Sequence, residues 1–490
     1  GGLVTENWFD LNASRYTASS TLQRMELLKT GYMGTLSLGW DNYLFLELTG
    51  RQERSSTLKD QSFFYPSANL SFLFSNAFRM PAWWNHGKLR LSYGVVGNAP
   101  ETYAANIIYE QGSDNGFTWN YVPSSWGNAN IRPEKKYEYE IGFESKFLNN
   151  RLGFDVSYYN NRVKDQILST PQPSTSGVKY VLMNVGEVAN EGWDISVSAT
   201  PVLTKNFRWD LTANYGIYRN KVVKLADGVP YLEISNIGGG GAKIQAVEGR
   251  PMGHIYVQVP QMNENGEYLV SDKGLYMNQT ELQRVGNINP DGVGGLFSSF
   301  SYKNIFLDFS IDFRIGGDVI NEMYQYSTAS GLTPESLQFR DTEHGGLSYY
   351  YPGNNNASGV PVQIDPSLGA GPNGEVIYHD GVVLPGVVAS TGEKNTRIIP
   401  AGYYYNQTYN WGTQPEQYTY RHSVFDNTYV KLRELTIGYQ FPEKLISKLG
   451  MTRLSVSVFG RNLFYFYKAL KNYDAESSVG TSWASQAVVG

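Results

Sequence analysis

The segment Asn304–Arg314 reads NIFLDFSIDFR, and it decides the fold because apolar and polar side chains alternate along it. Every second residue from Ile305 to Phe313 is apolar. Phe306 breaks the pattern once, and the remaining intervening residues are polar or charged. Successive side chains of a strand point to opposite faces. The segment therefore predicts a strand with one apolar and one charged face, as in a wall between lipid and a polar lumen.

The same alternation recurs along most of the chain, for example in Leu152–Tyr158 and Phe207–Ile217. Counting such segments predicts about twelve strands. One short helical pattern lies at Glu443–Leu449, and no run of 18 apolar residues exists, which excludes a helical membrane span. We therefore predict an all-β fold, a transmembrane, antiparallel, up-and-down β-barrel.

The composition fits this class. The 490 residues include 37 Tyr, 23 Phe and 10 Trp, whereas only 17% of the residues are charged. Aromatic side chains gather at the membrane interfaces of such barrels. A net charge of −5 gives no reason to expect nucleic acid as a partner, and the absence of cysteine excludes a thiol nucleophile.

The predicted connections between strands alternate strictly between short and long. The short ones lie at Asp41-Asn42, Leu148–Asn150, Pro201–Lys205 and Lys303, and the long ones at Ala99–Pro133, Ala226–Val293 and Asp318–Asp426. Outer-membrane barrels have short periplasmic turns and long extracellular loops. We therefore expect the long loops to lie outside the cell, since a soluble sandwich has no reason for such regularity.

The parity of the strands predicts further parts of the protein. With the long loops outside, this chain would both start and end on the outer side, whereas bacterial barrels have an even number of strands. We therefore expect residues 1–490 to be the C-terminal part of a plugged barrel of about 22 strands. The plug domain and the earlier strands would precede this chain.

Several motifs resemble one family. Asp426–Phe464 reads DNTYVKLRELTIGYQFPEKLISKLGMTRLSVSVFGRNLF, and Tyr473–Glu476 reads YDAE. With LTGRQERSSTL at Leu48–Leu58 and KLRLSYGVVGN at Lys88–Asn98, these segments resemble the SusC/RagA-like TonB-dependent outer-membrane transporters. Ala475 departs from the resemblance, because the family motif has proline there.

The resemblance implies an active importer in the bacterial outer membrane, with a plug inside the barrel and energy from the TonB complex. It also implies a SusD-like lipoprotein lid, substrates such as glycans or peptides, contact with lipopolysaccharide, and dimers of transporter–lipoprotein pairs. Two other hypotheses remain. One is a passive porin or structural barrel, and the other is a secreted all-β glycan-binding protein.

No catalytic or metal-binding pattern is visible in the sequence. The five histidines lack metal-ligand spacing, and neither a P-loop nor a nucleophile elbow is present. Glu138, Glu140 and Glu144 share one face of a predicted strand, and a polar lumen explains them more simply than a catalytic carboxylate pair. We expect a transport protein with no cofactor and no metal, rather than an enzyme.

Aromatic residues of the long loops are the candidates for ligand binding. Sugars and peptides both pack against exposed aromatic rings. The candidates are Trp119, Trp126, Tyr349, Tyr350, Tyr351, Tyr403, Tyr404, Tyr405 and Trp411. We expect a minority of them to contact the ligand and the others to pack loops together or against the lid.

Two cations follow the longest loop. Lys431 and Arg433 are in phase with Leu435, Ile437 and Tyr439, which face lipid in this interpretation. A cation on the lipid side is tolerated near the membrane interface. We therefore predict that both lie at the outer rim, facing lipopolysaccharide or the lipoprotein. A local twist that brings them into solvent is an equally good interpretation.

Overall fold

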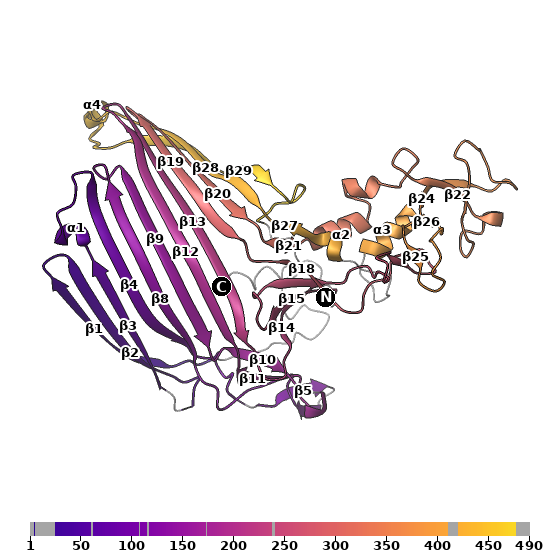
Figure 1. Ribbon diagram of the computed structural model, residues 1–490, viewed down its shortest axis with the longest axis horizontal. Coiled ribbons are helices and arrows are strands. Elements are labelled where there is room, and N and C mark those ends of the chain that lie inside the picture. The colour runs from indigo at the N-terminus through magenta and orange to yellow at the C-terminus, as the bar shows by residue number, and fades with distance from the viewer. Residues whose placement is uncertain are drawn as a thin grey trace.

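A curved antiparallel sheet of twelve strands, here called the wall, dominates the computed structural model (Figure 1). The structure describes residue 4 and residues 25–59, 62–106, 108–114, 117–172, 174–237, 241–409 and 420–476. Among these residues, no helix combines the length and the hydrophobicity that crossing a bilayer requires. Smaller sheets and a few helices lie in the connections of the wall.

The strands of the wall are neighbours in space in the same order as in sequence, and each pairs antiparallel with the next. The wall consists of β1 (Lys29–Trp40), β2 (Leu44–Ser55), β3 (Ser62–Phe72), β4 (Trp84–Asn98), β8 (Glu134–Phe147), β9 (Leu152–Lys164), β12 (Glu187–Leu203), β13 (Phe207–Lys224), β19 (Gly292–Tyr302), β20 (Ile305–Ile315), β28 (Tyr429–Gln440) and β29 (Ser455–Lys468). The predictions of an all-β, antiparallel, up-and-down wall and of about twelve strands are confirmed.

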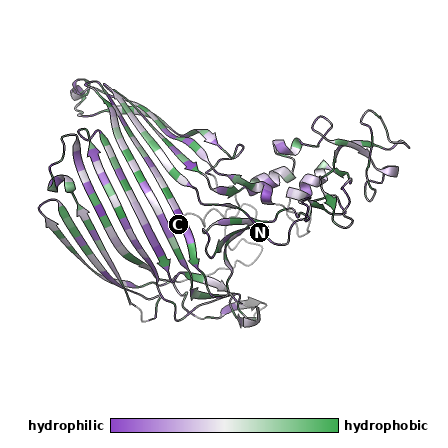
Figure 2. Cartoon of the chain, in the orientation of Figure 1, coloured by the Kyte–Doolittle hydropathy of each residue, from purple (hydrophilic) through white to green (hydrophobic). Residues whose placement is uncertain are grey.

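The register gives the wall two chemically different faces. Trp193 of β12 lies opposite Tyr158 of β9, which lies opposite Ile141 of β8, so apolar side chains share the outer face. Polar residues occupy the alternate positions, and Figure 2 shows hydrophobic and hydrophilic residues alternating along the strands. Trp193 is 47% exposed and Ile437 is 55% exposed. Such exposure of large apolar side chains is what a face covered by lipid requires.

Tight turns join strands at one end of the wall. Asp41 and Asn42 between β1 and β2, and Asn149 between β8 and β9, have φ between 45° and 59°. Asn and Asp tolerate this left-handed conformation better than other non-glycine residues, and it suits the short hairpins of a twisted sheet. The same end carries α1 (Phe74–Ala77), α4 (Glu443–Ile446) and η7 (Ser447–Leu449). The helical segment predicted at Glu443–Leu449 is therefore confirmed.

The lengths of the connections do not alternate strictly, so that prediction is wrong. The link between β2 and β3 on the loop side (residues 56–61) is shorter than two links on the turn side, which join β3 to β4 (residues 73–83) and β28 to β29 (residues 441–454). The two turn-side links are longer because each contains a helix. The turn predicted at Pro201–Lys205 also begins later, because β12 continues to Leu203.

Segments on the loop side form small sheets of their own. Their elements are β5 (Glu110–Asp114), β6 (Phe117–Tyr121), β7 (Ser125–Trp126), β10 (Ile167–Pro171), η2 (Ser174–Ser176), β11 (Tyr180–Asn184), β14 (Tyr231–Ile237), β15 (Ala242–Val247), β16 (His254–Val257), β17 (Leu269–Val270) and β18 (Gln283–Asn287). β7 pairs in parallel with β11, so two successive loops are joined to each other.

The connection between β20 and β28 forms an arm, defined as residues 318–426, which projects away from the wall (Figure 1). Its elements are β21 (Asp318–Ile320), α2 (Glu322–Ala329), η4 (Pro334–Leu337), β22 (Leu347–Tyr350), η5 (Pro352–Asn354), β23 (Val362–Gln363), β24 (Ile377–Val382), β25 (Val387–Val388), β26 (Ile399–Pro400), α3 (Ala401–Tyr409), η6 (Tyr420–Ser423) and β27 (Val424–Asp426). β21 pairs with β27 at the root of the arm, and β25 pairs with β17. The arm contains its own apolar clusters, one around Tyr349 and another around Ala401.

Candidate functional site

The polar face of the wall carries an open hollow of ≈ 630 Å³. Its lining residues come from β4, β9, β12, β13, β19, β20 and β28. The polar ones include Arg90, Asp155, Asp194, Ser196, Asn214, Asp312, Arg314 and Tyr429, and the apolar ones are Ile195, Val293 and Phe313. Their side chains offer guanidinium, amide and hydroxyl donors beside carboxylate acceptors. The hollow therefore suits a ligand that is rich in hydroxyl or amide groups.

Arg90 organises one side of the hollow. Its Nη2 donates to Asp155 Oδ1 at 2.5 Å and to Ser157 Oγ at 3.2 Å, and its Nη1 lies 3.4 Å from Glu144 Oε2. On the same strand as Glu144, Glu138 accepts a hydrogen bond from Asn161 Nδ2 at 3.1 Å. These carboxylates are held in polar networks of the wall, in the way that a polar lumen predicts.

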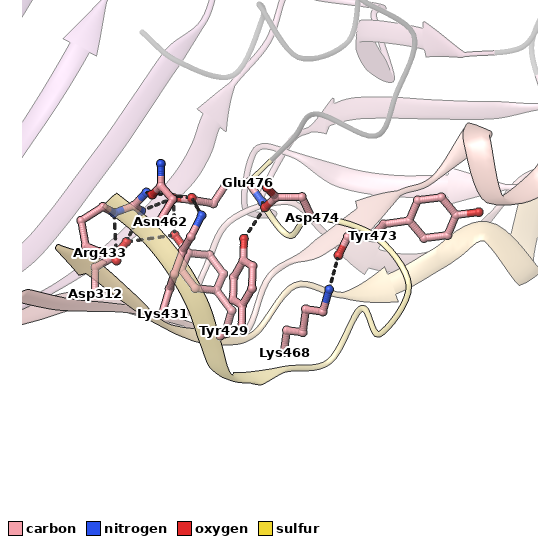
Figure 3. Close-up of polar contacts among 10 residues, drawn as sticks. Asp312, Tyr429, Lys431, Arg433, Asn462, Lys468, Tyr473, Asp474 and Glu476 are labelled. Carbon is pink, nitrogen blue, oxygen red and sulfur yellow. Dashed lines mark hydrogen bonds and ion pairs between the residues drawn. The ribbon is translucent and has the colours of Figure 1, made fainter. Parts of the chain in front are cut away.

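A second group of charged residues, here called the Arg433 cluster, consists of Asp312, Tyr429, Lys431, Arg433 and Glu476 (Figure 3). Lys431 Nζ lies 2.5 Å from Glu476 Oε2, and Arg433 Nη1 donates to the same oxygen at 2.8 Å. Arg433 Nε also donates to Asp312 Oδ1 at 3.1 Å. Tyr429 donates its hydroxyl hydrogen to Glu476 Oε1 at 3.3 Å. Two cations and two carboxylates thus meet on the polar face.

The lipid-facing orientation from which contact of Lys431 and Arg433 with lipopolysaccharide was predicted is therefore wrong, whereas their contact with a lipoprotein stays a prediction. Leu435 lies opposite Phe309 on the apolar face, but Lys431 lies opposite Asp312 on the polar face. The register changes between these positions because Arg433 is an extra residue of β28 against β20. Against β29 the extra residue belongs to β29, since Asn462 and Leu463 lie between the same two pairs that only Arg433 separates on β28. Such a β-bulge moves the residues beyond it to the other face.

Glu476 belongs to the segment that follows β29 and turns back over the wall (Figure 3). The guanidinium of Arg433, helped by Lys431, lowers the pKa of Glu476 to about 2 against the opposing effect of burial. The side chain of Lys431 is only 4% exposed. The carboxylate of Glu476 is therefore ionised at any physiological pH and neutralises a cation that is almost completely buried.

Three of the candidate aromatic residues are core residues of the arm. Tyr349, Tyr351 and Tyr405 are 1%, 8% and 3% exposed. Tyr349 donates a hydrogen bond to Asp380 Oδ1 at 3.1 Å, and its ring stacks on Tyr378 at 5.4 Å. Burial also raises the pKa of Tyr349 and of Tyr405. The structure contradicts the ligand-binding prediction for these three residues, because their rings have no free face.

The other candidates are more accessible. Trp126, Tyr350 and Tyr404 are half-buried. Trp119 on β6 is 48% exposed, and Tyr403 on α3 is 37% exposed. These two rings can still pack against a ligand, so for them ligand contact stays a prediction. Trp411 lies outside the described residues.

The residues of the Arg433 cluster other than its two cations were not selected from the sequence. Asp312 lies in the segment that predicts the fold, and Glu476 closes the YDAE motif. No local pattern links Glu476 to the two cations, because it follows Arg433 by 43 residues in the sequence. Within the described ranges, no group of three or more histidine, aspartate or glutamate side chains is placed to bind a metal ion.

Comparisons with known proteins give a consistent picture. A family model described as TonB dependent receptor-like, beta-barrel, matches residues 5–252, half of the chain. TonB-dependent receptor P3 of Formosa agariphila is 22% identical over 95% of this chain and 45% of its own length. TonB-dependent receptor SusC of Bacteroides thetaiotaomicron is 27% identical over 46% of this chain and 24% of its own length.

The structure of the RagAB peptide transporter matches the fold. It superposes with a TM-score of 0.68 at 18% identity and covers 97% of this chain and 48% of the RagAB chain. The chain thus spans about half the length of the relatives that it matches over most of its own residues.

Proposed function

Because this chain belongs to the TonB-dependent receptor β-barrel family, we propose that it forms part of the wall of an outer-membrane transporter that imports oligomeric nutrients with energy from TonB. Members of this family are outer-membrane transporters and not enzymes. One observation carries the proposal, namely a twelve-stranded wall with an apolar outer face and a polar inner face that holds a ligand-sized hollow. Such a wall separates lipid from an aqueous path.

The proposal includes a SusD-like lipoprotein that covers the loop side of the barrel. Long loops that fold into sheets of their own, together with the projecting arm, offer a broad surface for such a partner. In the same proposal, other residues of the full-length protein supply the remaining strands and the plug, which would complete a barrel of about 22 strands.

Oligomeric glycans and peptides are the two substrate classes in this proposal. The RagAB relative is a peptide transporter, which supports peptides. The hydroxyl, amide and carboxylate groups that line the hollow bind the polar groups of either class. Large polar oligomers also explain why an energised barrel is useful, because they exceed what a diffusion channel admits.

The proposal is tested by measuring uptake of fluorescently labelled oligomers in cells that express the full-length protein, with and without an intact tonB gene. We expect uptake to stop when TonB is absent. Uptake that continues at the same rate would support a passive porin instead, and that porin would also conduct ions across a planar bilayer.

The secreted glycan-binding alternative predicts a different behaviour on extraction. A protein whose apolar strand faces meet lipid leaves the membrane fraction only with detergent, whereas a secreted protein stays in solution without it. Recovery of the folded full-length protein from the soluble fraction without detergent would contradict the transporter proposal.

A further inference from the structure

The Arg433 cluster contains a carboxylate that a ligand could replace. We infer that Lys431 and Arg433 form a carboxylate-binding site in the luminal wall. Glu476 fills this site in the present state, and a carboxylate group of an imported oligomer takes it over when the Glu476 segment moves away. The inference deepens the proposed function and rests on it, because it assigns acidic oligomers as a substrate class.

The geometry is that of a carboxylate receptor. Oε2 of Glu476 lies 2.5 Å from Lys431 Nζ and accepts from Arg433 Nη1 at 2.8 Å, while Oε1 accepts from Tyr429 at 3.3 Å and also from Arg433 Nη2. Arg433 therefore holds both carboxylate oxygens. A planar guanidinium that binds both oxygens gives a strong and geometrically selective contact. Asn462 Oδ1 accepts from Arg433 Nη1 at 2.7 Å and helps to hold the guanidinium in place.

The charges of the cluster require an anion at the position of Glu476. In the present state, the two cations are balanced by Asp312 and Glu476. Without Glu476, Asp312 would be the one remaining carboxylate of the cluster. Asp312 pairs with Arg433, so it would not replace Glu476 as the partner of Lys431. Lys431, whose side chain is 4% exposed, would lose the carboxylate that now neutralises it. An unpaired buried charge is strongly unfavourable, so the vacated site would favour any carboxylate within reach.

The segment that carries Glu476 is attached in a way that permits exchange. Tyr473–Glu476 belongs to no strand. Lys468 Nζ donates to the carbonyl oxygen of Tyr473 at 2.9 Å, and the Tyr465 hydroxyl bonds to Asp474. The ring of Tyr473 meets Tyr324 of the arm edge-on at 6.4 Å. Each of these attachments involves a side chain, so the segment can move without breaking a β-ladder.

The site is also accessible from the hollow. Asp312 and Tyr429 belong to the Arg433 cluster and also line the hollow. A polar oligomer that occupies the hollow therefore lies next to Glu476. Because Lys431 is close to the start of β28, directly after the arm, the site lies at the loop end of the wall.

The test is the binding of small probes to the full-length protein in detergent, measured by isothermal titration calorimetry. The acidic probes are trigalacturonate and triglutamate, and the neutral counterparts are galactotriose and triglutamine. Glu476→Gln removes the internal competitor, so we expect it to bind at least one acidic probe at least tenfold more tightly than the wild type does. Combining it with Arg433→Gln should abolish that gain.

Glu434→Gln is the matched control, because Glu434 lies on β28 next to Arg433 but pairs with Arg461 of β29 at 2.9 Å, outside the cluster. It should leave the affinity for the acidic probes unchanged. A gain for trigalacturonate alone would identify uronic acids as the source of the carboxylate, and a gain for triglutamate alone would identify peptides. Unchanged affinity for both acidic probes, or an equal gain for the neutral probes, would overturn the inference.

A second variant covers the case in which Glu476→Gln does not fold. Tyr473→Ala leaves every residue of the cluster in place but removes the ring contact with Tyr324, and it should also bind an acidic probe more tightly. Failure of the carboxylate site can be distinguished from failure of the proposed transport function. Uptake that is independent of TonB refutes the transporter proposal, whereas unchanged affinity in a TonB-dependent importer refutes only the carboxylate site.

Discussion

At the scale of single residues, the bulge at Arg433 has the largest effect on the candidate site. It brings Lys431 and Arg433 from the face where the period-two pattern predicts them to the face that carries Asp312. A signal for this change is present in the sequence, because the apolar residues step by three from Leu432 to Leu435 instead of by two. The pairing with Glu476 was hidden, since it joins a strand to a segment outside any strand.

Glu476 should make stability depend on pH in a defined window. Its pKa is about 2 in the folded protein, against an ordinary value of 4.5. A carboxyl group whose pKa is lowered by folding stabilises the folded state at pH values above its pKa in the unfolded chain. The contribution of Glu476 to the free energy of unfolding is therefore complete above about pH 4.5 and is lost as the pH falls toward 2. We expect a loss of about 1–2 kcal/mol after solvent screening.

The measurement is thermal unfolding of the full-length protein in detergent between pH 6 and pH 2.5. The midpoint of the wild type should fall across this window, and Glu476→Gln should show a smaller fall. Glu434→Gln should keep the wild-type profile. If Glu476→Gln kept the full pH dependence of the wild type, Glu476 would not be the group that makes stability depend on pH.

Tyr405 should matter for the arm more than its neighbour Tyr403. The Tyr405 hydroxyl donates to the carbonyl oxygens of Glu335 at 2.8 Å and Gln338 at 3.2 Å. Tyr405→Phe should therefore destabilise the contact between α3 and η4 by about 1–2 kcal/mol. Hydrogen exchange should show faster exchange in α2, η4 and α3, with the wall unchanged. Tyr403→Phe, at an exposed position of the same helix, is the control. Equal rates of hydrogen exchange in the two variants would show that the hydrogen bonds of the Tyr405 hydroxyl do not stabilise the arm.

At the scale of elements, the strands were predictable and the helices of the arm were not. Each strand of the wall repeats the period of two many times, as Ile305–Ile315 does, so a single exception such as Phe306 does no harm. Helix α2 is different, because its buried residues are Glu322, Gln325 and Thr328. A search for apolar periodicity cannot find a helix whose buried side is polar.

Close contacts between strands give a prediction at this scale. A Cβ at Gly294 of β19 would lie 2.5 Å from the carbonyl oxygen of Asn214 and 2.5 Å from Phe313 Cζ. Backbone cannot move aside as a side chain can, so Gly294→Ala should cost about 1–3 kcal/mol. At Gly94 of β4, the nearest atom would be Ser67 Cβ at 3.8 Å, so Gly94→Ala should be tolerated. The folded fraction in detergent measures both, and equal yields would contradict the packing argument.

At the scale of the whole molecule, two chemically distinct faces define the wall, and they were the most predictable feature of the chain. Alternation predicts the two faces and the antiparallel order because both follow from local sequence. The position of the arm, the joining of β17 to β25 and the hollow depend on contacts between distant residues. Those contacts have no signature in the sequence of any one segment.

The assignment of the two faces is tested by a pair of neighbouring substitutions in β12. Val197 lies opposite Phe154 on the outer face, whereas Ser198 lies on the polar face with Asp194. Val197→Lys should destabilise the barrel by about 2–4 kcal/mol if the residue lies near the middle of the bilayer, and Ser198→Lys should be tolerated. The heat-modifiable folded band of the full-length protein in lipid measures both. Similar loss of the folded band for both variants would show that the faces are assigned wrongly.

The arm contains its own apolar clusters, and β21 paired with β27 closes its root. Such a part can change without disturbing the register of the strands that carry it. The arm can therefore vary in sequence together with the β13–β19 connection, to which the β17–β25 pair and the apolar cluster around Leu275 join it, while the ladder of the wall stays as it is.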